Sequence, residues 1–536
     1  MDQETVFRLV SATLLSMIFM LPVLAFAQDI DEKGLRQEAQ SPTDESRPPL
    51  PFSPPAPGQL WRTMAQVPSH QAPTTMQRQS SKRPLTLEQS IELALQHNVP
   101  LQIAKLSRDA VSYEVPRAKA LFHPTAGLSF LASGDRDVPE VGPAADRNAQ
   151  NTTAFISQLV PTGATVIVSS DFTREETDQA TPSRTFESAA TISVLQPLLR
   201  GGGLAVTTQP IRNAEYGVLI EEARLRATIL RVVAQAKSAY YTAILAEKLI
   251  AITEEAIQRD KTLVEASQAL FNAGLVTKRD VFSAEVILSQ DLARQASNQA
   301  DLITAKNVLL DVLGIPIATE LDLLDKELSF QPILLEPELA RWIEAAISNR
   351  PETLEVEERL AQNALNIRVA RNTLLPQLDL VAAYGKIHTA STFEKSLALR
   401  GETWTAGLVF SVPIGNVAAR SALTQTEIQE KRLQQDLIQV KRQIELEVRN
   451  AVIKLSRSIE LIRVLRIGVE QAEGKLEVAK ARFALGQADN FDITDAQEDL
   501  LQAQSDLLEA TADYNIGLAE LEASIAGPVV AARATP

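Results

Sequence analysis

The chain has 536 residues, no cysteine, a formal net charge of −15 and 45% hydrophobic residues. The lack of cysteine excludes disulfides, cysteine-based zinc sites, iron–sulfur clusters and thiol catalysis. The acidic balance argues against nucleic acid as a partner, because that function requires a basic face. The four histidines are too far apart in sequence to suggest a local metal motif, so we expect neither a metal nor a cofactor. They are His70, His97, His123 and His388.

The N-terminus carries an uncharged, mostly apolar run from Leu9 to Ala25, followed by Phe26 and Ala27. An apolar segment that ends in a small-x-small site predicts a secretory signal peptide over residues 1–27. The alternative is a transmembrane anchor, since the run is near the lower length limit for one. No cysteine follows the cleavage site, which excludes a lipid anchor on a leading cysteine.

Residues 28–84 hold ten of the 28 prolines of the chain. This composition predicts an unstructured linker with a polyproline bias. The linker is either a solvated leader or a tether that binds a partner.

The remaining sequence is duplicated. A shift of 252 positions places Pro124 on Pro376, and a later shift of 212 positions places Gly274 on Gly486. Each half therefore follows the order helix, strands, very long helix, glycine turn, helix. The expected organisation is a first repeat over residues 85–316, a linker over 317–336, a second repeat over 337–527 and a tail over 528–536.

The helical parts are unusually long, because no proline occurs between Ile211 and Ile315 or between Ile414 and Gly527. From Ile444 to Phe483 apolar residues recur at a mean spacing of about 3.5, the period of a coiled-coil seam. A helix over residues 211–271 would form a rod of about 90 Å.

Alternating apolar and polar residues predict strands between the helices. The alternating segments are 128–132, 191–194, 378–384 and 404–412. The longer ones approach the length of a tilted membrane strand, and one face of each is apolar. The alternative is a soluble sandwich with its core on one side. No segment after the first 27 residues is long and apolar enough for a spanning helix, so entry into a membrane requires a barrel. Two strand pairs in one chain are too few to close a barrel, and about twelve strands would need about three copies.

The first half carries surplus sequence between its helices. Pro124 and Pro197 are 73 positions apart, whereas Pro376 and Pro413 are 37 apart. The surplus, over about residues 151–172, predicts one additional hairpin. This hairpin either widens the barrel or folds over its outer mouth.

These features resemble the TolC family of outer-membrane efflux channels. The resemblance covers residues 85–527. It rests on the duplicated pattern and on Gln196-Pro197-Leu198-Leu199, Phe271-Asn272-Ala273-Gly274-Leu275-Val276, the segment Phe483 to Asp495 and Leu313-Gly314.

The resemblance implies a mainly α fold with a transmembrane β-barrel part. Three copies would form a twelve-stranded barrel in the lipid of the outer membrane, continued through the periplasm by an α-helical coiled-coil tunnel. The implied partners are a periplasmic adaptor protein and an inner-membrane transporter. Small-molecule efflux and type I protein secretion both use such a channel, so either remains open.

The resemblance also points to the tip of the tunnel. Gly274 and Gly486 are expected to be helix–helix turns there. Asp492 and Asp495, three residues apart on one helix face, match aspartates that form a pore constriction in the family prototype. Six carboxylates on one axis would attract cations. The alternative is that these carboxylates merely complement a helix dipole, as Asp280 also could.

The sequence departs from the prototype where the closed tip is locked. The prototype's arginine and tyrosine are replaced by Ala488 and Phe483. Arg279, next to Asp280, is a candidate substitute. Our hypothesis is that packing of Phe483 and Phe491 contributes to gating instead.

An enzyme is not expected, since the chain has no GxSxG or phosphate-binding motif. Arg200-Gly201-Gly202-Gly203 lacks the lysine of a phosphate loop and is expected to end a strand. The alternative to a channel is a periplasmic or surface coiled-coil scaffold without a pore.

Overall fold

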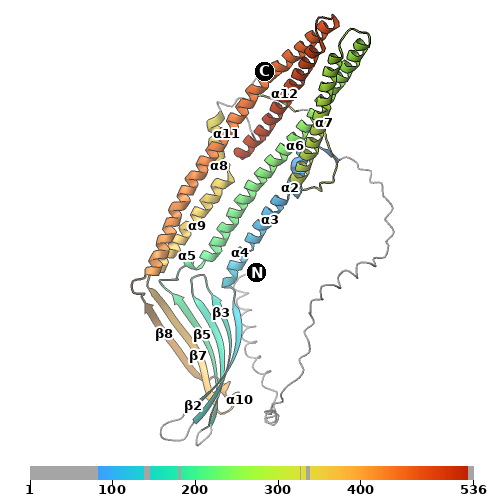
Figure 1. Cartoon of the computed structure of the whole chain (residues 1–536). Coiled ribbons are helices and arrows are strands. Elements are labelled where there is room, and N and C mark those ends of the chain that lie inside the picture. Colours follow the sequence, from blue (N-terminus) through green and yellow to red (C-terminus); the bar gives the residue numbers. More distant parts are fainter. Residues whose placement is uncertain (1–82, 138–144, 179–182, 326–327, 334–337, 529–536) are drawn as a thin grey trace, which may run out of the picture.

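The computed structural model describes residues 83–137, 145–178, 183–325, 328–333 and 338–528. The predicted signal peptide over residues 1–27 and nearly all of the linker over 28–84 lie outside this part. The molecule is elongated, with a β-sheet at one end and long helices extending away from it (Figure 1).

The large sheet is antiparallel and contains six strands in the order β2-β3-β4-β5-β7-β8. Its two outer strands, β2 and β8, have one unpaired edge each. The strands are β2 Thr125–Asp137, β3 Ala145–Leu159, β4 Thr165–Asp178, β5 Ser183–Pro197, β7 Gln377–Ala390 and β8 Gly401–Ser411.

The number of strands corrects the prediction from sequence. Four strands per chain were expected to form the wall, with the place of the extra hairpin left open. The extra hairpin is β3–β4, and it is paired along its length with β2 on one side and β5 on the other. The sheet of one chain therefore contains six strands rather than four. The physical reason is that β3 and β4 are as long as their neighbours, so they extend the sheet instead of folding over it.

The two faces of the sheet differ in polarity. The paired register places Leu128, Ile192, Tyr384, Trp404 and Leu408 on one face, all of them substantially exposed in the single chain. The opposite face carries mainly small and polar residues. Among them are Ser129, Thr153, Ser169, Asp171, Thr191 and Thr405. One face can thus lie against apolar surroundings while the other is hydrated.

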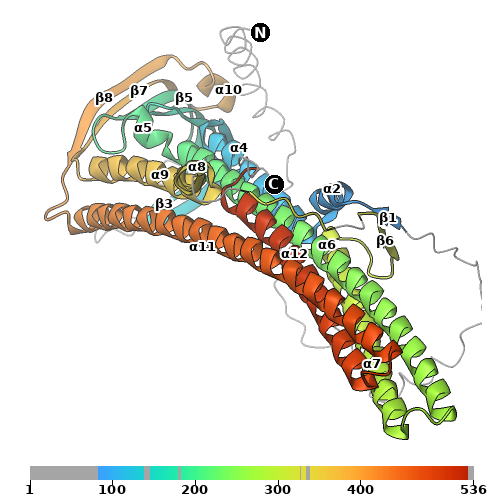
Figure 2. The same ribbon diagram turned by 90° about the horizontal axis from the view of Figure 1, so that it is seen from above.

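The helices form two long hairpins with shorter helices packed along them (Figures 1 and 2). Helices α6 and α11 contain 64 and 68 residues, which confirms the predicted rods. The first hairpin is α6 with α7, and the second is α11 with α12. Near the sheet, α3 and α4 pack on α6, and α9 packs between α6 and α11.

The helix bounds are as follows. They are α2 Leu87–His97, α3 Val99–Ser112, α4 Glu114–Lys119, η1 Ala120–Phe122, α5 Leu204–Thr207, α6 Gln209–Asn272, α7 Lys278–Leu313, α8 Leu339–Asn349, α9 Pro351–Thr373, α10 Phe393–Ser396, α11 Val417–Ala484 and α12 Asn490–Ser524. Within the described residues, none of these helices combines the length and hydropathy needed to cross a membrane.

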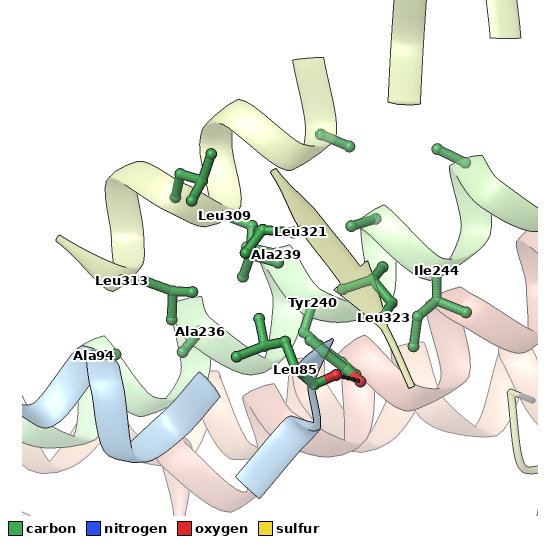
Figure 3. Packing of buried hydrophobic residues seen from close by; sticks show 14 of the residues in the cluster. Leu85, Ala94, Ala236, Ala239, Tyr240, Ile244, Leu309, Leu313, Leu321 and Leu323 are labelled. Atoms are coloured by element: carbon green, nitrogen blue, oxygen red, sulfur yellow. Dashed lines mark hydrogen bonds between the residues drawn. The ribbon is translucent and has the colours of Figure 1, made fainter. Parts of the chain in front are cut away.

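A small parallel pair, β1 Arg83–Leu85 with β6 Leu321–Leu323, closes a core against the middle of α6 (Figure 3). Tyr240 is fully buried there, and its hydroxyl donates to Oδ2 of Asp325 at 2.8 Å and lies 3.1 Å from the carbonyl oxygen of Leu85. Gly314 ends α7 with φ +66°, and a Cβ at this position would collide with the carbonyl oxygen of His97. The start of the first repeat is therefore fixed to its end.

Candidate functional site

Two glycine turns lie side by side at the end of the molecule farthest from the sheet (Figures 1 and 2). Gly274 joins α6 to α7 with φ +75°, and Gly486 joins α11 to α12 with φ +67°. In both turns the residue after the glycine donates its N–H to a carbonyl five residues earlier, at 2.9 and 2.8 Å. This is a Schellman cap, which needs the left-handed conformation that glycine adopts without strain. The two halves of the chain thus form the same helical tip.

Asp492 and Asp495 lie near the start of α12 and are exposed, whereas Ile493 and Ala496 beside them are buried. The two carboxylates therefore project from the same side of the tip, away from the apolar contacts of the helix. The capping role belongs to a different residue: Asp489 Oδ1 accepts from the N–H of Asp492 at 3.2 Å. Asp492 and Asp495 are thus not the side chains that close this helix terminus.

A lysine on the preceding helix contacts this acidic face. Lys475 Nζ lies 2.5 Å from Oδ2 of Asp495 and 2.5 Å from Oδ2 of Asp499. Its hydrogen bonds to Asp495 and then to Asp499 raise the pKa of Lys475. No pattern in the sequence indicates the role of Lys475, because this residue precedes the aspartates by about twenty positions and meets them only after the hairpin folds. One lysine against Asp492, Asp495 and Asp499 leaves the face acidic.

Asp280 has a local structural role. Its Oδ2 accepts from the backbone N–H of Thr277 at 2.8 Å and from the hydroxyl of the same residue at 2.6 Å. These bonds form a capping box at the start of α7. The hydrogen bonds from Thr277 lower the pKa of Asp280, and the charge of Arg279 lowers it further. Arg279 therefore acts on Asp280 through its charge, while Thr277 supplies the hydrogen bonds.

The two phenylalanines at the tip differ in environment. Phe483 is half-buried and packs against a cluster that contains Leu263, Leu476 and Ile493. Phe491 is 63% exposed. Within one chain they do not share a core, so their joint contribution to gating stays a hypothesis about the assembled protein.

Asn490 connects the two hairpins, a role that its position in the sequence does not indicate. Its side chain is 1% exposed. Nδ2 donates to the carbonyl oxygen of Asp280 at 2.9 Å and to the hydroxyl of Ser267 on α6. The contact fastens the first turn of α12 to both helices of the other hairpin. The only signal in the sequence was an asparagine directly before an aspartate-rich helix start, which predicts a cap rather than a link.

An open groove of about 610 Å³ runs between the first turns of α7 and α12. Phe282, Val286 and Phe491 line it, and each is at least half exposed. Asp495 and Glu498 form part of its rim. The groove thus combines apolar side chains with carboxylates, next to both glycine turns.

A pair of acidic residues is buried farther from the tip, between α6 and α7. Asp260 is 2% exposed and Asp291 is 6% exposed. Burial raises the pKa of Asp260 to about 7, and the adjacent Asp291 adds to the shift, while the charge of Arg259 opposes it. Arg294 lies 3.4 Å from Oδ1 of Asp291. The side chain of Asp260 therefore takes up a proton at a much higher pH than an exposed aspartate does.

Comparison with known proteins identifies the architecture. The model of the family described as Outer membrane efflux protein matches residues 90–315 and 342–527. The chain belongs to this family. The resemblance to TolC-type channels seen in the sequence is thereby confirmed.

The chain is similar to relatives whose names indicate different roles. The outer membrane efflux protein BepC of Brucella suis is 23% identical over 330 residues, which cover 60% of this chain and 68% of BepC. The alkaline protease secretion protein AprF of Pseudomonas aeruginosa is 24% identical over 313 residues, covering 58% of this chain and 64% of AprF. The matched segments thus span about two thirds of these relatives.

The fold agrees with a solved channel. The structure of the outer-membrane channel OprN has a TM-score of 0.62 and 18% identity, covering 82% of this chain and 90% of that one. The chain is therefore an outer-membrane protein of the efflux and secretion channels and not an enzyme.

Proposed function

We propose that three copies of the chain form a continuous conduit. The sheets close into a barrel in the outer membrane, and the helical hairpins form a tunnel whose tip faces the inner membrane. One observation carries this proposal: the amphipathic sheet with two unpaired edges and the paired glycine turns lie at opposite ends of the same rods. Unpaired edges of this length require a partner strand, and a second copy supplies one.

Asp492 and Asp495 form the narrowest and most acidic part of the conduit in this proposal. Both are exposed in the single chain and project from one side of the tip. Three copies would place six such carboxylates around one axis, where they attract cations and repel anions. Lys475 holds Asp495 in place and reduces the charge without cancelling it.

The groove between α7 and α12 supports the proposed partners. A periplasmic adaptor protein is expected to dock helices along the tip, since apolar side chains flanked by carboxylates suit an amphipathic helix with a basic margin. The adaptor would connect the channel to an inner-membrane transporter. BepC is described as an efflux protein and AprF as a protein for protease secretion, and the proposed conduit serves either kind of cargo.

The acidic constriction is tested by conductance in planar bilayers. Asp492→Ala together with Asp495→Ala should reduce the preference of the channel for cations several-fold. The matched control is Asp301→Ala with Asp311→Ala, which removes two exposed carboxylates from α7 at a distance from the tip. Cation selectivity that stays the same in the first variant would remove the constriction from the proposal. Equal loss in both variants would show that only total charge matters.

The trimer is tested separately. Outer membranes that contain the protein should yield a three-copy complex in mild detergent. A single-chain particle that leaves liposomes impermeable would favour the scaffold without a pore.

A further inference from the structure

Four of the six strands continue directly into helices. Strand β2 follows the helical segment that ends at Phe122, and β7 follows α9. Strand β5 leads through the short helix α5 into α6, and β8 leads into α11. Strands β3 and β4 do not: they are joined to each other at the helical end of the sheet by residues 160–164. The hairpin is thus an addition to a wall that otherwise has one strand for each helix.

The turn of the added hairpin is fixed to the rest of the sheet. Gly163 has φ +97° and lies against the loop after β5. The carbonyl oxygen of Thr162 accepts from the N–H of Gly203 at 3.2 Å and from Nε2 of Gln196 at 3.2 Å. The hydroxyl of Thr162 lies 3.0 Å from Oε1 of Gln196. The glycine run after β5 therefore anchors the β3–β4 turn.

The strand directions permit an all-antiparallel closure. Each neighbouring pair in the sheet is antiparallel and the number of strands is even, so β2 and β8 run in opposite directions. Strand β8 of one copy can therefore pair antiparallel with β2 of the next. The apolar face is continuous across this junction, because Trp404 and Leu408 on β8 and Leu128 and Phe130 on β2 lie on the same face and are exposed.

We infer that the assembled barrel has eighteen strands, six from each of three copies, and that β8–β2 pairing between copies closes it. The inference rests on the proposed trimer. It assigns the β3–β4 hairpin to the barrel wall and makes the lumen about half as wide again as that of a twelve-stranded barrel, since diameter grows roughly linearly with strand number.

The dimensions of the helical part agree with this number. With strands about 4.8 Å apart and tilted by about 40°, eighteen strands give a circumference of about 110 Å and twelve give about 75 Å. Near the sheet each copy presents four helices, namely α4, α6, α9 and α11. Twelve helices packed at about 9 Å have a circumference of about 110 Å. Eighteen strands therefore continue the tunnel without a taper, and the barrel is not the part of the conduit that limits cargo size.

Cysteine cross-linking can test the arrangement, because the chain has no cysteine of its own. Leu128, Ala154, Ser170 and Ala190 occupy one row across β2, β3, β4 and β5. In outer membranes treated with a short thiol cross-linker, Leu128→Cys should link to Ala154→Cys within one chain, and Ser170→Cys should link to Ala190→Cys. Leu128→Cys with Ala190→Cys should not link, since three strand spacings of about 4.8 Å separate them.

The junction between copies is tested by a second set of variants. Leu408→Cys is combined in turn with cysteine at Ala126, Leu128 or Phe130, all on the same face. At least one combination should give covalent dimers and trimers on denaturing gels.

The outcomes separate the inference from the proposed function. A Leu128–Ala190 link in a three-copy complex would place the hairpin outside the wall and overturn the eighteen strands, while the trimeric channel would stand. Covalent dimers without trimers would indicate closure by two copies and would overturn both. Electron cryomicroscopy of the detergent-solubilised complex gives an independent strand number, and a count of twelve would also reject the inference.

Discussion

Asn490→Ala is expected to loosen the tip of the tunnel. The substitution removes the hydrogen bonds from α12 to Ser267 and to the carbonyl oxygen of Asp280 on the other hairpin. A buried hydrogen bond contributes about 0.5–1.5 kcal/mol, so the two together contribute about 2 kcal/mol in each copy. That free energy corresponds to a roughly 30-fold change in the equilibrium between attached and detached hairpins. Single-channel recordings in planar bilayers should therefore show a larger open fraction or a higher mean conductance.

A matched control separates opening from general loss of stability. Asn515 lies on the same helix and is 5% exposed, and its Nδ2 donates to the carbonyl oxygens of Ser329 and Thr511 at 3.0 and 2.8 Å. Asn515→Ala should lower the thermal unfolding temperature by a similar amount without changing conductance. If both variants are destabilised equally and Asn490→Ala conducts like the unmodified protein, the reasoning about this link is refuted.

Other variants test the helical scaffold. Asp260→Asn should remove a pH dependence. Because the pKa of Asp260 is raised, its contribution to the free energy of unfolding is fully present below about pH 4 and is lost as the pH rises through about 7. The unmodified protein should therefore lose thermal stability between these pH values, and Asp260→Asn should lose less. An unchanged dependence of the unfolding temperature on pH would contradict the assignment. Gly314→Ala should lower the free energy of unfolding by about 2 kcal/mol or more, because the alanine would have a left-handed φ and its Cβ would clash with the carbonyl oxygen of His97. Denaturant unfolding measures this change, and a neutral effect would show that the loop relaxes. Tyr240→Phe should lower the free energy of unfolding by about 1–2 kcal/mol in the same assay. No loss of stability would mean that water replaces the hydroxyl.

Most of the fold could be predicted from local patterns. Proline-free stretches and a 3.5-residue apolar period predict α6 and α11, and the paired glycines predict the turns between the hairpins. These features depend on contacts between residues close in sequence. The number of strands in the wall could not be predicted, because β3 has the same alternating pattern whether it pairs with β2 or folds away. The two arrangements are distinguished only by the observed pairing of β2 with β3, which begins with Thr125 opposite Ser157 and continues along both strands.

The candidate site was predicted where its chemistry is local and missed where it is not. Asp492 and Asp495 share an exposed helix face, as their spacing indicates. Lys475 reaches them from another helix, and Asn490 forms its link with residues more than two hundred positions away. No spacing rule relates such residues, since their proximity results from the packing of the two hairpins. Asp280 is the converse case. The resemblance to the family prototype connected it with the lock of the closed tip, and in the structure its carboxylate caps the start of α7.

The composition of the buried clusters leads us to expect that the tip, rather than the middle of the rods, is the part that moves. The two clusters in the middle contain large side chains such as Tyr240 and Tyr514 together with leucines and isoleucines, and alanine makes up six of sixteen buried residues in the first and two of eleven in the second. The cluster near the tip is half alanine, namely Ala284, Ala472, Ala479 and Ala496, among eight buried residues. Alanine buries far less apolar area than leucine, so each contact near the tip contributes less to stability. Polar links such as that of Asn490 then make up a larger share of what holds the hairpins together there. Because a hydrogen bond is lost over a much smaller displacement than the apolar contact of a large side chain, separation of the hairpins at the tip can leave the sheet end of the conduit unchanged.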